Sequence, residues 1–257
     1  MDALIGHSGF VGSTLLRQRR FDACFRSTDI EHIAGGSFDT VVCAGISATK
    51  WQANRAPEED RAAIDRLLRA LEKIECRRFV LISTVDVFAR PQGIDERALP
   101  DAVEPYGRHR LDAERALRER FRGCVVVRLP GLVGPGLRKN ALYDLAHGHR
   151  IAHLDPRAVF QFYPMVNLWT DVRAILDAGM DTAHLTAEPL ALGAVAHDAF
   201  SLPLDVPDAI AMQPPPRYDL RSQHADALGG SGGYVYSARE SLLAIRAYAQ
   251  HVRETSR

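Results

Sequence analysis

Apolar residues in the first half of the chain alternate between two spacings. Short continuous runs, each with the length of a buried strand, occupy residues 2–5, 40–44, 78–83 and 123–129, with a shorter run near 23–26. A helical repeat is clearest among charged residues at Ile64, Leu67, Leu68, Leu71 and Ile74. Strands that alternate with helices predict the α/β class, as a doubly wound parallel sheet of the Rossmann type with helices on both faces.

The first predicted strand ends in a glycine-rich turn that opens a helix. Gly6, Gly9 and Gly12 follow a G-x-x-G-x-x-G spacing. The first glycine permits a tight turn, the second lets backbone approach a pyrophosphate, and the third allows close packing of a helix whose N–H groups point at the phosphates. The turn therefore predicts a dinucleotide site. Its predicted contacts are Gly6, Ser8, Gly9, Phe10, Val11 and Gly12.

The second half of the chain has a looser pattern of loops and shorter helices, interrupted by a proline run and a glycine run. Near its end, Ser237 and Glu240 form an S-x-x-E capping box, which predicts the start of a final helix. We therefore predict a dinucleotide-binding Rossmann domain over residues 1–130. Residues 131–257 are predicted to form a smaller substrate-binding region, partly interleaved with the Rossmann sheet.

Composition narrows the function classes mainly by exclusion. Lys+Arg and Asp+Glu residues number 32 each, so no net charge favours nucleic acid or an anionic membrane as a partner. The four cysteines lack C-x-x-C spacing and three lie in or beside apolar runs, so we expect buried thiols and no metal site. The absence of a signal-peptide pattern or a long uncharged apolar run predicts a cytoplasmic protein.

Two polar groups of residues are placed where chemistry is expected. Ser83 and Thr84 lie at the carboxyl end of a predicted strand, the edge where doubly wound folds bind ligands. Tyr106 and Arg110 lie four residues apart on a predicted helix, so their side chains share one face. A fixed positive charge would lower the phenol pKa from its usual value of about 10 toward the range of acid–base catalysis.

These segments, in this order, resemble those of the extended short-chain dehydrogenases/reductases in the NAD-dependent epimerase/dehydratase group. The nucleotide-sugar branch is the most similar, particularly the dehydrorhamnose reductases. Cys43-Ala44-Gly45 resembles the segment that lies along the cofactor, and residues 128–136 resemble the R-x-x-x-x-Y-G-P-G segment. Residues 160–164 and 169–172 resemble the substrate-side segment of the reductases. The resemblance spans roughly residues 1–172.

The resemblance implies roles for further residues. Thr84, Tyr106 and Arg110 would form the catalytic set. The cofactor side would add Arg26, Ser27, Cys43, Ala44, Gly45, Ser83, Tyr106, Arg110 and Pro130. The substrate side would comprise Asp86, Asn140, Gln161, Tyr163 and Trp169, most of which have an ordinary structural role as the alternative.

One residue departs from the family pattern, because Y-x-x-x-K reads here as Tyr106-x-x-x-Arg110. Arginine keeps a permanent cation and can bind ribose hydroxyls, but it does not readily pass protons. The resemblance therefore implies that Arg110 lowers the tyrosine pKa and holds the nicotinamide ribose, without a lysine-dependent proton relay. His109 either supplies that relay or faces solvent at the start of the helix.

The implied function is that of an NAD(P)-dependent oxidoreductase acting on a nucleotide-linked keto-sugar, with 4-keto reduction preferred. An epimerase with a retained cofactor and a non-catalytic dinucleotide-binding sensor or scaffold are the alternatives. Val85 stands where sugar 4,6-dehydratases have an acidic residue, which disfavours dehydration. Arg26 and Ser27 slightly favour NADP over NAD, although Asp29 lies close by. No nucleic-acid or membrane partner is expected, and a homodimer is left open.

Overall fold

A computed structural model describes residues 1–255 of the chain, which form two compact units. The first unit comprises Met1–Ala89, Ala98–Leu129 and Leu168–His184. The second comprises Arg90–Arg97, Pro130–Asn167 and the chain from Leu185 onward. The predicted boundary lies at residue 130, with a second region partly interleaved with the sheet, and the contacts assign residues 168–184 to the first unit and residues 90–97 to the second.

The first unit is built on a six-stranded parallel sheet in the order β10-β6-β4-β3-β1-β2. The strands are β1 (Asp2–Ile5), β2 (Ala23–Phe25), β3 (Ser37–Cys43), β4 (Glu75–Thr84), β6 (Cys124–Leu129) and β10 (Thr182–His184). This confirms the predicted α/β fold class, and each of the five predicted strands is present. The order reverses at β1, because β2 lies on one side of it and β3 on the other. Doubly wound sheets bind ligands at the carboxyl ends of the strands beside such a reversal.

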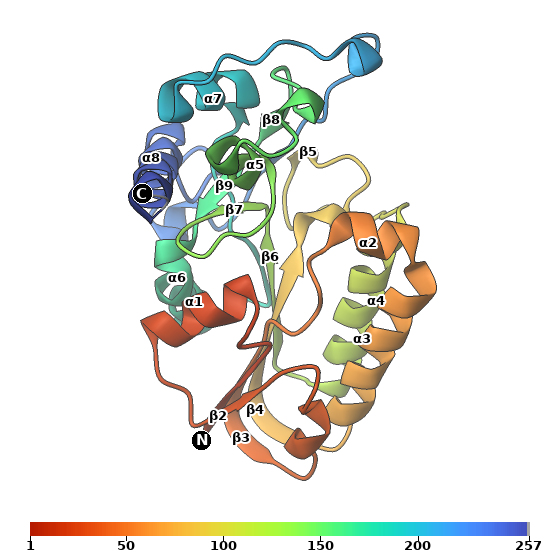
Figure 1. The fold of residues 1–257 in the computed structure, drawn as a ribbon. Coiled ribbons are helices and arrows are strands. Elements are labelled where there is room, and N and C mark those ends of the chain that lie inside the picture. The colour runs from red at the N-terminus through yellow and green to blue at the C-terminus, as the bar shows by residue number, and fades with distance from the viewer. Residues whose placement is uncertain (256–257) are drawn as a thin grey trace. The chain divides into compact units, whose positions relative to one another are not determined.

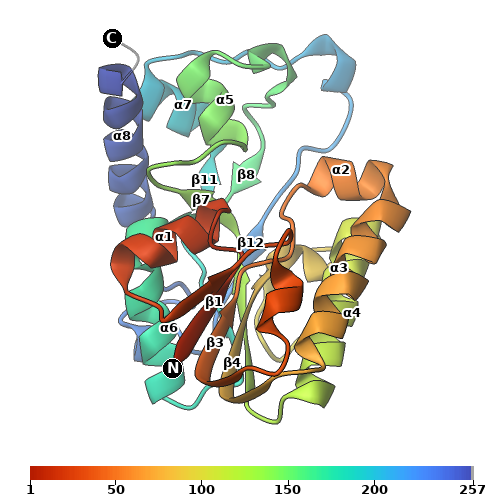
Figure 2. The ribbon, with the colours of Figure 1, turned by 60° about the horizontal axis from the view of Figure 1, so that its bottom comes forward.

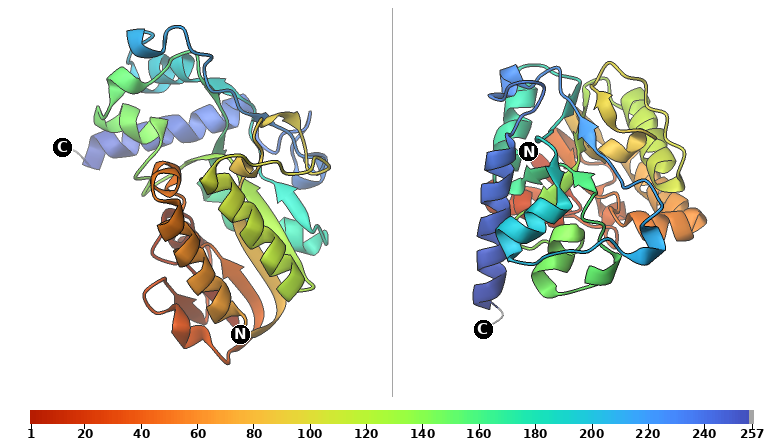
Figure 3. Two further views of the ribbon diagram at one scale, coloured as in Figure 1. Left: turned by 90° about the vertical axis from the view of Figure 1, so that its right-hand side faces the viewer. Right: turned by 90° about the horizontal axis from the view of Figure 1, so that it is seen from above.

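Helices cover both faces of this sheet (Figure 1). α3 (Pro57–Leu71) and α4 (Pro105–Arg120) lie side by side on one face, as the left-hand view of Figure 3 shows, with the short α2 (Lys50–Arg55) preceding α3. α1 (Phe10–Gln18) and α6 (Leu168–Asp177) lie on the other face and contact each other (Figure 2). Short 3-10 turns occupy Ile30–Ile33 (η1) and Val85–Val87 (η2).

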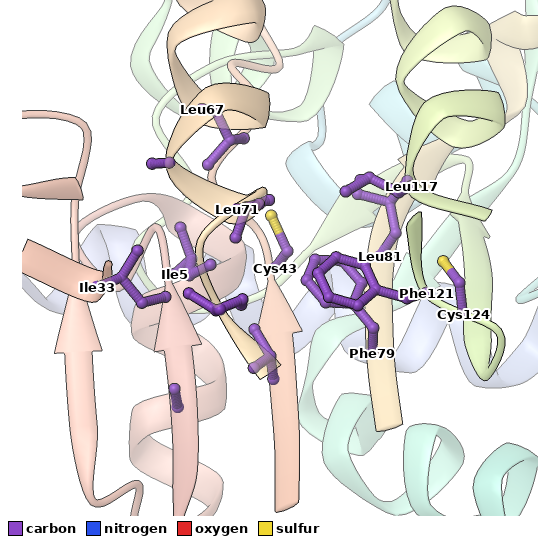
Figure 4. Packing of buried hydrophobic residues seen from close by; sticks show 14 of the residues in the cluster. Ile5, Ile33, Cys43, Leu67, Leu71, Phe79, Leu81, Leu117, Phe121 and Cys124 are labelled. Carbon is purple, nitrogen blue, oxygen red and sulfur yellow. The ribbon is translucent and has the colours of Figure 1, made fainter. Parts of the chain in front are cut away.

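The hydrophobic core of the first unit fills the space between the sheet and α3 and α4 (Figure 4). The predicted helical repeat contributes part of this core, because Leu67 and Leu71 of α3 point into it. Phe79 of β4 and Phe121 at the end of α4 stack with ring centroids 4.5 Å apart. The Cys43 thiol is buried here, and burial raises its pKa to about 11, as expected for an inert thiol.

The second unit contains α5 (Ala141–His147), α7 (Leu192–Phe200) and α8 (Ala238–Thr255), which contact one another (Figure 2). Its short strands pair as β7 (Gly131–Val133) with β9 (Phe162–Pro164), β8 (Val159–Phe160) with β11 (Leu190–Ala191), and β5 (Gln92–Ile94) with β12 (Asp219–Leu220). Its 3-10 turns are η3 (Ile151–His153), η4 (Met165–Asn167), η5 (Asp208–Ile210) and η6 (Asp226–Leu228).

The predicted capping box at the start of α8 is confirmed. The Ser237 N–H donates to Glu240 Oε2 at 2.8 Å, and the Glu240 N–H donates to Ser237 Oγ at 3.3 Å. Across residues 1–255, no helix has both the length and the apolar character needed to cross a membrane.

Candidate active site

The glycine turn after β1 is tight, and its geometry requires glycine at positions 6 and 12. Gly6 has a φ of +84°, and its N–H donates to the Phe25 carbonyl at 2.7 Å. A Cβ on Gly12 would lie 2.2 Å from the Gly6 carbonyl oxygen, so any side chain there would force the turn and α1 apart. Gly9 precedes α1 and supplies no side chain to its first-turn N–H groups. These donors suit an anion.

The segment that follows β3 contacts this turn directly. The Ala44 N–H donates to the Ile5 carbonyl at 2.9 Å, and a Cβ on Gly6 would lie 2.3 Å from the Ala44 carbonyl oxygen. Two segments predicted separately as cofactor contacts, Gly6–Gly12 and Cys43–Gly45, therefore meet where the strand order reverses. The glycines at the closest approaches and the adjacent helix N-terminus fit a dinucleotide pyrophosphate.

The residues expected to choose between NADP and NAD form an ion pair with each other. Asp29 Oδ1 accepts from the Arg26 N–H at 2.6 Å, and Arg26 Nε lies 3.6 Å from Asp29 Oδ2. The Arg26 side chain remains 52% exposed. The cation that favours a 2′-phosphate and the carboxylate that favours free ribose hydroxyls thus partly neutralise each other. Ser27, beside them, is exposed.

Thr84 and Tyr106, predicted as catalytic residues, are brought together at the carboxyl end of β4. Thr84 Oγ1 accepts from the Asp86 N–H at 3.2 Å and hydrogen-bonds with the Tyr106 side chain. Tyr106 lies in the first turn of α4, where it is 5% exposed and its N–H donates to Asn54 Oδ1 at 2.9 Å. A Cβ on Gly107 would lie 2.1 Å from the Asp86 carbonyl oxygen, so only glycine lets α4 approach η2 this closely.

Arg110 lies over the Tyr106 ring, with its guanidinium carbon 4.0 Å from the ring centroid. Its terminal guanidinium nitrogens, however, are hydrogen-bonded to other groups of the protein. Its Nη1 and Nη2 groups donate to both carboxylate oxygens of Asp60 and to the Ser47 and Tyr106 carbonyls. The side chain is only 3% exposed. The Nη1 and Nη2 groups are thus already bound inside the protein, and of the guanidinium nitrogens only the buried Nε has no hydrogen-bond partner among the described residues. This arrangement does not support the predicted role of holding the nicotinamide ribose.

His109 does not face solvent, because its Nδ1 lies 2.8 Å from Asp60 Oδ2 and its side chain is 12% exposed, while its role in a proton relay stays a prediction. Asp60 thus binds His109 and Arg110 together. Burial raises the pKa of the Asp60 carboxyl, but hydrogen bonds from Arg110 and His109 outweigh it, and the net pKa lies below its ordinary value. Asp60 is therefore a charged anchor for the start of α4.

The pKa of Tyr106 is raised above its ordinary value, contrary to the expectation that Arg110 would lower it. Burial is the largest cause, and the Asp86 carboxylate adds to it. Arg110, the Thr84 hydrogen bond and Lys50 each lower the pKa without overcoming burial. The buried phenol therefore stays protonated at neutral pH.

Three residues near Tyr106 were missed by the sequence analysis: Lys50, Asn54 and Asp60. The Lys50 ammonium donates to Asp86 Oδ1 at 2.7 Å, while Asn54, four residues later on α2, binds the Tyr106 N–H. The i, i+4 spacing was visible, but α2 is too short to show an apolar repeat. Asp60 follows Pro57 and two glutamates, a pattern typical of an ordinary first helical turn.

Four other predicted site residues have structural roles. The Gln161 amide, 1% exposed, donates to the Ala187 and Leu220 carbonyls and accepts from the Leu220 N–H. Tyr163 is fully buried. The predictions that these two side chains contact substrate are therefore replaced by roles in holding the second unit together. Asn140 caps α5, its Oδ1 accepting from the Leu142 and Tyr143 N–H groups. Trp169 packs against Arg19, whose guanidinium carbon lies 4.2 Å from its ring centroid.

Ser83, predicted to contact the cofactor, belongs instead to a buried polar network that joins β4, α4, β6 and β10. Its hydroxyl donates to Glu114 Oε1 at 2.5 Å. Arg128 donates to Glu114 Oε1 at 3.1 Å and to Glu114 Oε2 at 2.6 Å, and also donates to His184 Nε2 at 3.2 Å. The network fixes the carboxyl end of β4, and with it Thr84. Pro130, the last predicted cofactor contact, begins a segment of the second unit.

Comparison with models of known families identifies the family of the chain. A family model described as the NAD dependent epimerase/dehydratase family matches residues 19–157, more than half of the sequence. The chain belongs to this family. The matched range contains Thr84, Tyr106 and Arg110, while the glycine turn lies just before it. A comparison with curated proteins gives no match.

Solved structures of the epimerase/dehydratase type share the fold. A dTDP-4-dehydrorhamnose reductase from Clostridium acetobutylicum superimposes with a TM-score of 0.73 at 15% identity, covering 98% of this chain and 100% of that chain. A dTDP-4-dehydrorhamnose reductase from Bacillus anthracis in complex with NADP gives 0.73 at 14% identity, covering 97% and 98%. A UDP-glucuronic acid 4-epimerase from Bacillus cereus in complex with NAD gives 0.72 at 14% identity, covering 99% and 100%. These identities establish the fold alone.

Proposed function

We propose that this member of the epimerase/dehydratase family is an NAD(P)-dependent oxidoreductase that reduces a nucleotide-linked 4-keto-sugar. The observation that carries the proposal is the pairing of the Thr84 hydroxyl with the Tyr106 phenol at the carboxyl end of β4, in the unit that also contains the glycine cradle. Similar structures support the substrate class, because they include dehydrorhamnose reductases and UDP-sugar epimerases.

The residues of this chain divide the work between binding and proton transfer. Gly6, Gly9 and Gly12 would hold the pyrophosphate against the N-terminus of α1. A bound NAD(P)H supplies the hydride. The Thr84 hydroxyl would orient the substrate carbonyl oxygen, and Tyr106 would donate a proton to it. Because burial raises the pKa of Tyr106, the phenol is held in the protonated form that reduction requires.

An epimerase is the second candidate, since UDP-sugar 4-epimerases are among the similar structures. An epimerase uses the tyrosine alternately as base and acid and returns its cofactor to the starting oxidation state. Net loss of NAD(P)H absorbance distinguishes the two reactions.

The test is the turnover of Tyr106→Phe with nucleotide-linked 4-keto-sugars, followed by NAD(P)H absorbance. Removal of a positioned acid should lower kcat by about 10²–10⁴-fold, with dinucleotide affinity unchanged. Tyr248→Phe is the matched control, because the buried Tyr248 hydroxyl has no hydrogen-bond partner among the described residues. Wild-type turnover in Tyr106→Phe would contradict the mechanism. Epimer formation without NAD(P)H consumption would favour the epimerase, and tight dinucleotide binding without turnover would favour a sensor.

A further inference from the structure

A pocket of about 540 Å³ lies beside α3 and α4 and belongs wholly to the first unit. Its walls come from α3, from α4 and from the segment just before α4. The α4 residues Arg108, Asp112 and Arg115 line it and, being three or four positions apart, share one face of the helix. Tyr106 and Arg110 are buried on another face. The pocket is therefore separate from the candidate active site.

Arginine side chains outnumber carboxylates around this pocket. Arg61, Arg108 and Arg115 line it, against Asp101 and Asp112. Asp112 is shared between two of the arginines, because Arg61 Nη1 lies 2.9 Å from its Oδ2 and Arg115 Nη1 lies 3.7 Å from its Oδ1. The Arg108 side chain makes no hydrogen bond or ion pair with any residue from 1 to 255. The pocket therefore presents more hydrogen-bond donors than acceptors.

The second carboxylate does not supply the acceptors that these donors lack. Asp101 Oδ1 accepts from the Ala89 N–H at 2.8 Å, which fixes the segment before α4 to the residues that follow β4. Arg115 is 63% exposed, and its distance to Asp112 exceeds that of a hydrogen bond. Arg108 and Arg115 can therefore turn their guanidinium groups toward a ligand without breaking a hydrogen bond inside the protein.

The chemistry of the walls defines the class of ligand. A guanidinium group presents a planar fork of donors that matches the oxygens of a carboxylate or a phosphate. The volume lies within the range of roughly 300–1,000 Å³ that is typical of sites for small organic molecules. Pro100 and Leu111 add apolar surface beside the arginines, which suits the carbon body of such a molecule.

We propose that this pocket binds a small organic anion, whose phosphate or carboxylate group is held by Arg108 and Arg115. It is a second ligand site, and the inference does not depend on the proposed function. His109 also lines the pocket, and its Nδ1 is bound to Asp60. The ligand would therefore lie next to the carboxylate that anchors the start of α4.

Isothermal titration calorimetry at low ionic strength tests the pocket with glycerol 3-phosphate and with citrate, and with glycerol as the uncharged comparison. Full-length Gly9→Leu serves as the parent protein, so that a phosphate held at the glycine turn does not contribute. We expect Arg108→Met in this parent to weaken anion binding by at least about tenfold, because hydrogen bonds to a charged group are lost. Glycerol should not bind.

Arg69→Met in the same parent is the matched control. Arg69 is an exposed arginine in the last turn of α3, and it does not line the pocket. Its loss should leave the affinity unchanged. Urea unfolding should give equal midpoints for the parent and for Arg108→Met, because no partner within the described residues loses a contact.

Binding of glycerol 3-phosphate alone, or of citrate alone, would support the inference and identify the acid group that the pocket prefers. Failure of both anions to bind would overturn it, as would an unchanged affinity in Arg108→Met. Equal losses in Arg108→Met and Arg69→Met would also overturn it, because general surface charge would then account for the binding. A protein that turns over no nucleotide sugar would contradict the proposed function and leave these titrations unaffected.

Discussion

Replacing Arg110 by methionine is expected to destabilise the first unit by about 3 kcal/mol. Arg110 and Asp60 form a buried ion pair, with side chains 3% and 8% exposed. Removing one partner of such a pair typically costs about 3–5 kcal/mol, because the other charge is left buried. His109 would remain hydrogen-bonded to Asp60 and offset part of this loss, so the lower end of the range is expected.

The matched control is Arg61→Met, which removes an arginine from an exposed pair. Arg61 Nη1 lies 2.9 Å from Asp112 Oδ2, but the two side chains are 44% and 40% exposed. Exposed pairs contribute at most about 1 kcal/mol, because water and salt screen the two charges. The two variants lose the same charge and differ mainly in the burial of the carboxylate left behind.

Urea unfolding followed by tryptophan fluorescence measures the difference. Both tryptophans, Trp51 and Trp169, belong to the first unit, so the signal reports the unit that contains the pair. With an m-value of about 2 kcal/mol/M, Arg110→Met should lower the midpoint by about 1.5 M and Arg61→Met by less than about 0.5 M. Equal midpoints for the two variants would refute the assignment of Arg110 to a buried structural pair.

Further predictions concern acid stability, the cofactor site and the buried network. The pKa of folded Asp60 lies below its unfolded value of about 3.9. The ionised carboxylate therefore stabilises the fold above about pH 3.9, and this stabilisation is lost as the pH falls through the folded pKa. In urea unfolding, the difference in stability between wild type and Asp60→Asn should shrink over that acidic range. Gly9→Leu should fold, because a Cβ meets only the Gly6 carbonyl at 3.4 Å, but calorimetry should detect no dinucleotide binding. Arg26→Ala should weaken NADPH binding by about 1–3 kcal/mol and leave NADH binding unchanged, and equal effects would remove Arg26 from the site. Glu114→Gln should cost about 3–5 kcal/mol in unfolding experiments, because it leaves Arg128 buried without its carboxylate.

The sequence was sufficient for the parts of the fold that depend on local patterns. Gly6 has the positive φ of its turn and Gly12 lies against the Gly6 carbonyl oxygen, so the spacing of these glycines predicted the turn, but not the approach of Ala44 to Gly6. The buried face of α3 follows from the period of its apolar residues, and the α8 cap from Ser237 and Glu240. Strand β10 was not predicted, because three residues are too few to show an apolar run.

The surroundings of Tyr106 were less predictable, because they depend on contacts between distant segments. Asp60 lies 50 residues before Arg110, and a lone aspartate in a helical first turn gives no sign that it binds an arginine elsewhere. Its presence changes the chemistry of Arg110 from an available cation to a paired one. Gln161 illustrates the same limit in the second unit, where a polar residue expected to face a ligand binds the backbone.

The place of β10 at the edge of the sheet has a consequence for how the protein is synthesised. Residues 130–167, which belong to the second unit, leave the ribosome before α6 and β10. Until His184 emerges, β6 has an unpaired edge and Arg128 lacks its histidine. A fragment that stops at residue 130 is therefore expected to aggregate through this exposed edge. The first unit can be completed only after part of the second has been made, so the two cannot fold one after the other along the chain.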